Sequence, residues 1–600
     1  MRVNLPCGVS TIAITLALAF SLLWPALLAA AGIAGPVPAD LLARQAAEYR
    51  AEAPKTILEL QQFRHVENIA ATGGGGRVGT VTLVNINPGI NAWFVLTLDW
   101  GPRGRVSYHL ENPRPRTQAI DLGDPGSPGV SIKTDDRTIS CDLWSGTATA
   151  LDQAQHSALP YAPLCEGRLY LRNRVRGNQT NLERVTDFLR DHVWGGEMIV
   201  RTVREEFYSD RFLEKGVPGA ASSTPDGETL HPDWPLPAAF TIPPGERSSV
   251  PQDLGIDLGQ AMSALMPGRW YPVNGLAGAY VSFAQPRLID PQILRGDRGA
   301  VNPLDEVETD ALDYLVAFDL TQMEVGFTLG TDHPRVNWSE RPPGNMRDAK
   351  LPGPDGIDTI APLVSNGMIS PAMSARTIAT FTGGFKREHG AFRYGPLAER
   401  NHGSHYGFIE EGAVLSKLIP GLSTLYVLDD GSVDMKTWTS DDDALLSRIR
   451  DARQNGVALI EYDAASGASV PGALVTRWGP GNWSGSADEK LRTVRAGLCL
   501  QQTDSRRFLV YGYFSAATPS AMVRVFQAYH CRYAMHLDMN ALEHTYIALY
   551  VRAGNQIRVE HLVQGMAQLD KSEDSKVLPR FLSFPDDRDF FYVTQRGAPQ

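Results

Sequence analysis

Three polar side chains alternate at the end of an apolar run near the C-terminus. In the stretch YAMHLDMN, His536, Asp538 and Asn540 stand at every second position. A β-strand places every second side chain on the same face, so we expect these three side chains to lie together. A carboxylate on such a rigid support can act as an acid, a base or a nucleophile. Asp538 is therefore the principal catalytic candidate, with the capping of a turn as its alternative role.

Histidines are concentrated in the same part of the chain, where six of the 13 fall between residues 389 and 544. His536, Asp538 and His544 are candidate ligands of a divalent metal such as zinc or manganese. A second group consists of His389, His402 and His405. No HExxH-type spacing fixes a metal site, so these histidines could instead line a polar cleft, with His389 as a proton donor. A divalent metal is the one cofactor that the sequence suggests, and none is assigned.

Two adjacent glycines end a second apolar run. In the stretch ATFTGGFK, Gly383 and Gly384 follow strand-like residues, although glycine weakens both helix and strand. Their two neighbouring N–H groups could form a concavity that binds an anion such as phosphate, with Lys386 and Arg495 supplying positive charge. The alternative is a simple turn.

The order of three segments resembles the phosphodiester glycosidase domain family over roughly residues 270–555. In that family a strand enters an NGGFF-like turn, an RTAIG-like strand follows, and a helix leads into a strand that ends LDGGGS. The segments TFTGGF, RTVRAGLCL and HLDMNALEH stand in those places here. The resemblance implies that a sugar-1-phosphodiester is hydrolysed, with Asp538 as the matching carboxylate and Arg495 or Arg492 as the matching arginine.

The substrate site expected on these grounds combines the matched positions with nearby charged and aromatic residues. Its members are Thr382, Gly383, Gly384, Phe385, Lys386, Tyr406, Arg492 and Asn540, with Trp478 and Trp483 as further sugar platforms. The chain departs from the family pattern at Thr382, which replaces an asparagine. It departs again at Met539, Asn540 and Ala541, which replace glycines. Side chains at these places could narrow the pocket, change the substrate or remove catalysis.

Three functions follow from these patterns. The first is an exported hydrolase that acts on a sugar-1-phosphodiester or a related envelope glycoconjugate. The second is a non-catalytic carbohydrate-binding protein on the same fold, and the third is a metal-dependent hydrolase that uses the histidines. A carbohydrate or glycoconjugate is the expected partner in the first two cases. The net charge of −11 argues against general nucleic-acid binding, which needs a basic face.

The N-terminus is typical of an exported protein. One arginine precedes about twenty apolar residues that end in small residues, so we expect residues 1–35 to be a signal peptide or, if uncleaved, a membrane anchor. The body is then periplasmic or secreted. Outside this segment the cysteines are Cys141, Cys165, Cys499 and Cys531. An even set in an oxidising compartment suggests two disulfides between nearest neighbours, although three connectivities or four free thiols are open.

The remaining chain suggests two folded regions. Residues 36–214 are expected to form an N-terminal α+β domain of unknown role, residues 215–252 a linker rich in Pro, Gly and Ser, and residues 253–600 the glycosidase-like domain. The fold class expected is α+β, with a mixed β-sheet and packed helices in the C-terminal domain and a smaller β-rich domain before it. Helices are predicted at 440–456 and 518–531 from their capping signals.

Overall fold

The computed structural model describes residues 43, 47, 56–124, 126–181, 183–185, 188, 210–215, 217–218, 231–243, 249–259, 265–333, 359–386, 406–477, 490–554, 556–574 and 576–597. We call these the described residues. The N-terminal segment 1–35 lies outside them. Among the described residues, no helix is long and apolar enough to cross a membrane.

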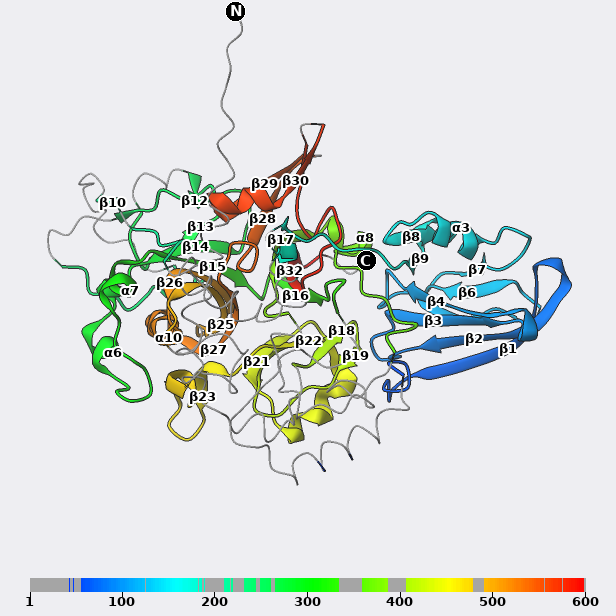
Figure 1. Ribbon diagram of the computed structural model, residues 1–600, viewed down its shortest axis with the longest axis horizontal. Helices are drawn as coiled ribbons and strands as arrows, with labels where there is room; N and C mark the ends of the chain where they lie inside the picture. Colours follow the sequence, from blue (N-terminus) through cyan, green and yellow to red (C-terminus); the bar gives the residue numbers. More distant parts are fainter. Residues whose placement is uncertain are drawn as a thin grey trace, which may run out of the picture.

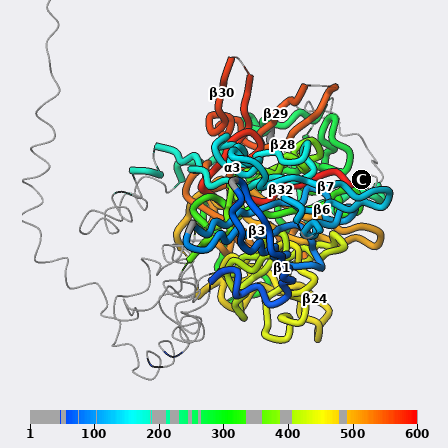
Figure 2. The backbone as a smooth tube through the Cα atoms, turned by 90° about the vertical axis from the view of Figure 1, so that its right-hand side faces the viewer, coloured from blue at the N-terminus to red at the C-terminus, as the bar shows by residue number. Residues whose placement is uncertain are grey.

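The first part of the chain forms two antiparallel sheets, which lie at one end of the molecule (Figure 1, Figure 2). The six-stranded sheet has the order β1 (His65–Gly73), β2 (Arg77–Asn85), β3 (Trp93–Asp99), β4 (Arg105–Glu111), β9 (Leu169–Arg172) and β8 (Tyr161–Leu164). The three-stranded sheet consists of β5 (Ala119–Leu122), β6 (Gly129–Lys133) and β7 (Thr138–Asp142). One short helix, α3 (Ala150–His156), is capped by Thr149.

Both faces of the strand β3 are buried, against different cores. Phe94 and Leu96 belong to a core made by the N-terminal sheets alone. Trp93 and Val95 belong to the main core, which they share with the rest of the chain. Since neighbouring side chains of a strand point to opposite faces, the six-stranded sheet is sandwiched between the two cores. The N-terminal sheet is therefore packed directly onto the C-terminal region.

The C-terminal region contains three larger sheets, and every ladder between its named strands is antiparallel. The eight-stranded sheet has the order β13 (Tyr271–Pro272), β14 (Ala279–Ala284), β15 (Asp313–Asp319), β26 (Arg507–Ala517), β25 (Thr493–Gln502), β27 (Cys531–Met539), β23 (Ala458–Asp463) and β24 (Ala468–Pro471). The six-stranded sheet has the order β12 (Leu254–Gly255), β29 (Gln556–Val563), β28 (Ile547–Ala553), β17 (Thr377–Thr382), β32 (Phe590–Gln595) and β16 (Met323–Thr328). The five-stranded sheet has the order β19 (Ala413–Ser416), β18 (Phe408–Glu410), β22 (Ile449–Gln454), β20 (Ser423–Leu428) and β21 (Val433–Thr437). Two-stranded ladders join β10 (Val217–Pro218) to β11 (Ser249–Val250) and β30 (Lys571–Glu573) to β31 (Lys576–Leu578).

Helices are few and short in the described residues. They are α6 (Pro291–Arg295), α7 (Glu306–Asp310), α8 (Pro371–Ser374) and α10 (Pro519–Ala528) in the C-terminal region. The prediction for 518–531 is confirmed by α10, since Thr518 accepts a hydrogen bond from the Ala521 N–H and Pro519 occupies the first turn.

The expected α+β class is wrong, because the described residues form mainly antiparallel sheets rather than a sheet with packed helices. The predicted helix at 440–456 shows the reason. Only Ser440–Arg448 is helical, as a 3₁₀ segment, and Ile449–Gln454 forms the strand β22 between β18 and β20. Capping signals show where a helix can begin. The second half of this segment forms a strand instead, because it pairs with two neighbouring strands.

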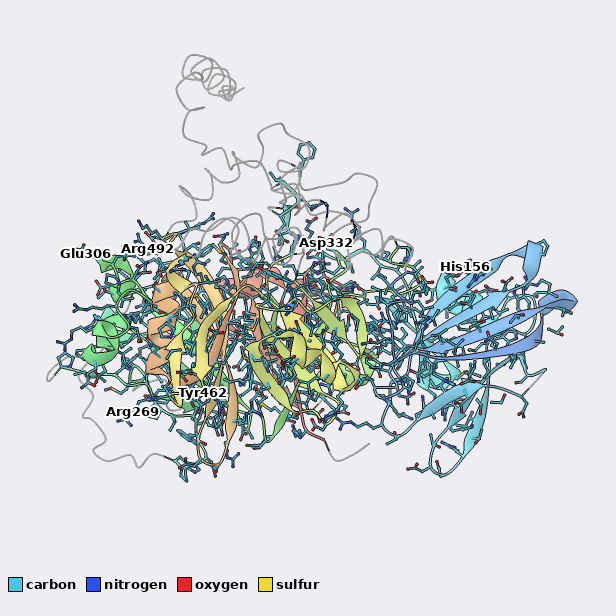
Figure 3. The ribbon with its side chains drawn as sticks, turned by 90° about the horizontal axis from the view of Figure 1, so that it is seen from below. His156, Arg269, Glu306, Asp332, Tyr462 and Arg492 are labelled. Atoms are coloured by element: carbon cyan, nitrogen blue, oxygen red, sulfur yellow. A yellow bond between two sulfur atoms is a disulfide. The ribbon has the colours of Figure 1, made fainter. Side chains whose placement is uncertain are left out.

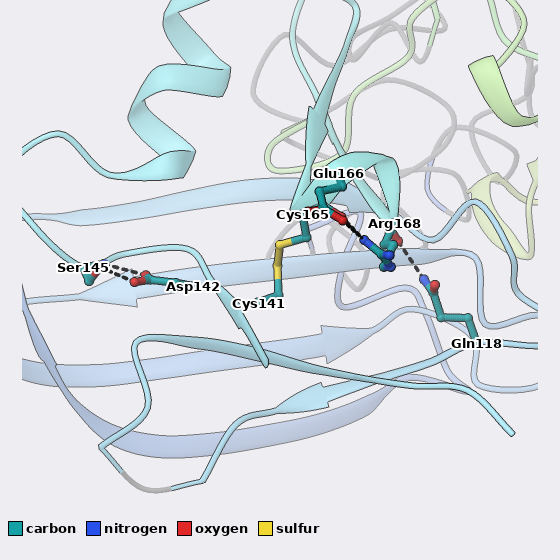
Figure 4. Close-up of a disulfide and its surroundings, with 7 residues drawn as sticks. All are labelled: Gln118, Cys141, Asp142, Ser145, Cys165, Glu166 and Arg168. Carbon is teal, nitrogen blue, oxygen red and sulfur yellow. Dashed lines mark hydrogen bonds and ion pairs between the residues drawn. A yellow bond between two sulfur atoms is a disulfide. The ribbon is translucent and has the colours of Figure 1, made fainter. Parts of the chain in front are cut away.

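Both expected disulfides are present. Cys141 is bonded to Cys165, with Cα atoms 5.8 Å apart, and Cys499 to Cys531, with Cα atoms 5.7 Å apart. The first bond ties the end of β7 to the turn that follows β8 (Figure 4). The second joins the neighbouring strands β25 and β27. Two disulfides fit a protein that folds in an oxidising compartment outside the cytoplasm.

A buried arginine fastens the N-terminal sheet to the C-terminal region. Arg172, at the end of β9, lies with its Nη1 2.9 Å from Glu111 Oε2 and its Nη2 3.9 Å from Glu410 Oε1. Its Nε donates to Asn366 Oδ1 at 2.9 Å, and the guanidinium lies 3.9 Å from the ring centre of Trp93. Glu410 and Asn366 belong to the C-terminal region, so removing Arg172 would leave Glu111 without its ion pair and would break the contacts to the C-terminal region.

We expect Arg172→Met to lower the free energy of unfolding by about 3–5 kcal/mol, because it leaves the buried Glu111 carboxylate without its cation. Arg168→Met is the matched control. Arg168 pairs with Glu166, whose side chain is 84% exposed, so its loss should cost less than about 1 kcal/mol. Urea unfolding measures both. Equal effects of the two changes would contradict a fastening role for Arg172.

Candidate active site

Asp538 lies near the end of β27, a central strand of the eight-stranded sheet. Its Oδ2 accepts a hydrogen bond from Arg588 Nη1 at 2.7 Å, and its Oδ1 accepts one from the Met539 N–H at 2.8 Å. The residue is only 4% exposed. Burial raises the pKa of Asp538 from its ordinary 3.8 to about 7, and Arg588 only partly opposes the rise. Near neutral pH the carboxyl therefore exists in both protonation states.

Five charged or titratable side chains gather around this carboxyl and form a cluster of six with it. The six are Glu183, Lys386, Asp538, His544, Asp587 and Arg588, and we call them the Asp538 cluster. Arg588 bridges two of the acids, because its Nε lies 2.5 Å from Glu183 Oε1 while its Nη1 contacts Asp538. Lys386 Nζ lies 2.7 Å from Asp587 Oδ2 and 3.9 Å from Glu183 Oε1.

The three carboxyl groups of the cluster differ in protonation. Burial alone would raise the pKa of Glu183, but Arg588 and Lys386 hold that pKa well below its usual range. Burial raises the pKa of Asp587 to about 7, because Lys386 offsets it only in part and Glu183 adds to it. Two aspartates of the cluster can thus exchange protons near neutral pH while the glutamate stays ionised.

His544 is the most open member of the cluster, with a side chain that is 20% exposed. Its Nδ1 lies 2.7 Å from the Met539 carbonyl oxygen, and its Nε2 lies 3.8 Å from Glu183 Oε1. Burial and the nearby Arg588 lower the pKa of His544 well below its ordinary range, so the imidazole is neutral at neutral pH. The Nδ1 contact requires that nitrogen to carry the proton, which leaves Nε2 as an acceptor.

The glycine turn packs closely against Asn455, another residue of the protein, at Gly384. Gly384 has a φ of +130°, and a Cβ atom there would lie 2.6 Å from Asn455 Oδ1. Asn455 accepts from the Phe385 N–H at 3.1 Å and donates through Nδ2 to the carbonyls of His536, at 2.7 Å, and Leu537, at 2.5 Å. The Gly383 N–H donates to the Asp589 carbonyl. The turn is thereby fastened to the strand that carries Asp538.

The two candidate arginines occupy different places. Arg495 is buried beside β27, where its Nη1 lies 3.3 Å from both His536 Nε2 and Met539 Sδ. Arg492 pairs instead with Asp210 and with Asp305, the N-cap of α7. Figure 3 accordingly shows Arg492 beside Glu306 at the end of the molecule that is farthest from His156 of the N-terminal sheets. Of the two, only Arg495 lies against the strand of Asp538.

Of the other predicted site residues, three are buried, one follows the strand of Asp538, and five lie outside the described residues. Thr382 is buried and donates to the His544 carbonyl at 2.7 Å, Phe385 stacks on His536 with ring centres 5.3 Å apart, and Tyr406 is buried under Arg453. Asn540 follows β27 with a φ of +81° and is 8% exposed. The remaining residues, His389, His402, His405, Trp478 and Trp483, lie outside the described residues.

The three metal candidates do not form a ligand set. Asp538 contacts Arg588, His536 contacts Arg495, and His544 faces the Met539 carbonyl. Within the described part of the chain, no group of three His, Cys, Asp or Glu side chains is placed to hold a metal ion.

Four residues of the site were not foreseen from the sequence: Glu183, Asn455, Asp587 and Arg588. The run PDDRDFF at 585–591 was the available signal, because four charged residues directly precede the buried strand β32. In the fold each of the four charged residues in this run has ion-pair partners of its own. Asp586 pairs with Arg580, Asp587 with Lys386, Arg588 with Glu183 and Asp538, and Asp589 with His333.

No family model and no curated protein matches the sequence. Among solved structures, the chain is similar to the catalytic domain of zebrafish N-acetylglucosamine-1-phosphodiester alpha-N-acetylglucosaminidase, auto-inhibited by its pro-peptide. That match has 9% identity, covers 54% of this chain and 90% of the other, and has a TM-score of 0.25. A hypothetical protein from Synechocystis is similar over 88% of this chain and 98% of its own, with 9% identity and a TM-score of 0.27. Similarities this low establish neither family nor activity.

Replacing the second glycine of the turn should be far more damaging than replacing the first. Gly384→Ala forces a side chain into left-handed backbone and against Asn455, so we expect a loss of about 2–4 kcal/mol in the free energy of unfolding. At Gly383 the nearest atoms to an added Cβ lie 3.3 Å away and φ is not positive, so Gly383→Ala should cost about 1 kcal/mol or less. Urea midpoints compare the two, and equal losses would contradict this account of the turn.

Asp538 should also make stability depend on pH. Because its pKa rises from 3.8 to about 7 on folding, the folded protein keeps a proton that the unfolded chain releases. Its contribution is therefore fully present below about pH 4 and is lost as the pH rises to about 7. We expect the stability of the wild type relative to Asp538→Asn to fall by on the order of 3 kcal/mol between pH 4.5 and 7.5. Asp135→Asn, at an exposed turn, is the control, and a constant offset for Asp538→Asn would refute the titration.

Proposed function

We propose that the protein is an exported hydrolase that cleaves a sugar-1-phosphodiester or a related envelope glycoconjugate, with Asp538 as the acid, base or nucleophile. The observation that carries the proposal is a buried carboxyl whose pKa is about 7, held at the end of a rigid strand. General acid–base catalysis is most effective when the pKa of the group lies near the working pH.

The neighbours of Asp538 supply the other groups that such a reaction needs. Glycoside cleavage commonly uses two carboxyl groups, and Asp587 is a second one with a pKa of about 7. Arg588 and Lys386 could balance the charge of a phosphoryl group as it leaves, if a substrate drew them from their carboxylates. The neutral Nε2 of His544 adds an acceptor at the open side of the cluster.

One observation favours a second function, a non-catalytic carbohydrate-binding protein. Both oxygens of Asp538 are already hydrogen-bonded, and only 4% of the residue is exposed. Asn540 and Met539 stand where the resembling family has glycines, and both are buried. A substrate would reach the carboxyl only if the segments around it moved, so the Asp538 cluster could equally serve as a structural ion network.

Turnover of a chromogenic sugar-1-phosphodiester separates the two functions. If Asp538 transfers a proton or attacks the sugar, Asp538→Asn should lower kcat by on the order of 10² to 10⁴ while the protein stays folded. Circular dichroism and the thermal midpoint check the fold, and elemental analysis of the same preparation checks for metal. Asp135→Asn is the matched control and should keep full activity. Full activity of Asp538→Asn would exclude the catalytic role, and an inactive wild type on all such substrates would favour the binding protein.

A further inference from the structure

A polar pocket lies where the N-terminal sheet meets the C-terminal region. One wall is the loop after β4, with Arg114 and Arg116, and the other carries Arg376 and Arg450. Glu324, Glu411 and Asp429 also line it. The pocket shares no residue with the Asp538 cluster. Its volume of about 230 Å³ is smaller than the ~300–1,000 Å³ of drug-sized sites, so it suits a small ligand.

This pocket carries more positive than negative charge. Arg116 lies 3.8 Å and Arg376 3.5 Å from the two oxygens of Glu324, so one carboxylate serves two guanidinium groups at distances longer than a tight ion pair. Asp429 is already paired with Arg448 at 3.0 Å. Burial, together with the nearby Asp451, raises the pKa of Glu411 to about 8, so this carboxyl is mostly neutral at pH 7. Arg450 is neutralised by Asp451, so the excess positive charge comes from Arg114, Arg116 and Arg376, which face the single carboxylate of Glu324.

The arginine-bearing loop is held rigid by its own polar contacts. The Arg114 N–H donates to Asn112 Oδ1 at 3.1 Å, and Asn91 Nδ2 donates to the Pro115 carbonyl at 3.0 Å. Gln118 Nε2 donates to Asn112 Oδ1 at 2.9 Å. Prolines before and after Arg114 fix two further backbone angles. Little ordering is therefore needed when a ligand arrives, which favours binding.

The opposite wall is fixed as well. Arg376 donates through Nη2 to the Gln595 carbonyl at 2.8 Å, and Arg450 donates through Nη2 to the Val325 carbonyl at 2.6 Å. Arg450 is in addition paired with the buried Asp451, whose Oδ2 lies 3.0 Å from its Nε, so Arg450 shapes this wall but adds little unpaired charge. Within the described residues, the Arg114 side chain has no hydrogen-bond or ion-pair partner, and this exposed arginine lines the pocket with its five donors available.

We propose that this pocket binds a phosphate-type oxyanion, either free phosphate or the phosphoryl group of a phosphorylated sugar. Planar guanidinium groups recognise phosphate oxygens through paired hydrogen bonds, and several of them around one pocket provide charge as well as direction. Met373 and Ile90 add an apolar patch against which an attached sugar could lie. The proposal rests on the pocket alone and stands whether or not Asp538 is catalytic.

Titration calorimetry of the full chain tests the proposal, with inorganic phosphate, glucose 6-phosphate and glucose as probes at low and constant ionic strength. We expect phosphate or glucose 6-phosphate to bind, glucose not to bind, and the Arg114→Gln/Arg116→Gln variant to bind at least tenfold more weakly. Tighter binding of glucose 6-phosphate would identify a phosphorylated sugar as the ligand, and equal binding would identify the phosphoryl group alone. Binding should also weaken as salt is raised.

The Arg105→Gln/Arg137→Gln variant is the charge-matched control, because both arginines are exposed and neither lines the pocket. It should bind as the wild type does. The proposal is overturned if neither anion binds to the wild type, if the Arg114→Gln/Arg116→Gln variant keeps full affinity, or if the control loses affinity to the same extent. A thermal midpoint within about 2 °C of the wild type shows that a loss of affinity does not come from unfolding.

Discussion

Arg588 has to be paired on two sides, because a buried guanidinium without carboxylates would carry a desolvation cost of several kcal/mol. It takes one partner, Asp538, from the end of β27, and the other, Glu183, from a segment 405 positions earlier in the chain. Asp587 directly precedes Arg588 and pairs with Lys386, which lies two residues after Gly384. One ion-pair requirement thus brings together four segments, and the position of each depends on the other three.

Asn455 also holds two segments together, through hydrogen bonds rather than ion pairs. Its amide joins the backbone of the glycine turn to the backbone of β27, and the turn can come this close only because Gly384 has no side chain. A change at either residue would move the turn relative to the strand, and with it Lys386 relative to Asp538. The two glycines suggested a site for an anion. In the structure they have a structural role, because they let the turn pack against Asn455.

Local patterns in the sequence predicted local features well. The helix α10 follows from Thr518 and Pro519, the strands β17, β25 and β27 from their apolar runs, and the disulfides from four cysteines in nearest-neighbour pairs. The fold class failed because segments with helical capping signals, such as Ser440–Arg448, lead directly into paired strands. Glu183 and Arg588 could not be matched in advance, because ion pairs leave no periodic trace and hundreds of residues separate them.

The unequal protonation of the Asp538 cluster follows from how few cations its three acids share. Glu183 lies against both Arg588 and Lys386, and the attraction of two cations outweighs its burial. Asp538 has to share Arg588 with this glutamate, and Asp587 has to share Lys386 with it. Each aspartate therefore faces a cation that is already largely neutralised, so burial dominates and both pKa values rise to about 7. Burial is thus the main reason that the two aspartates hold protons at neutral pH, and the ionised glutamate beside their cations adds to it.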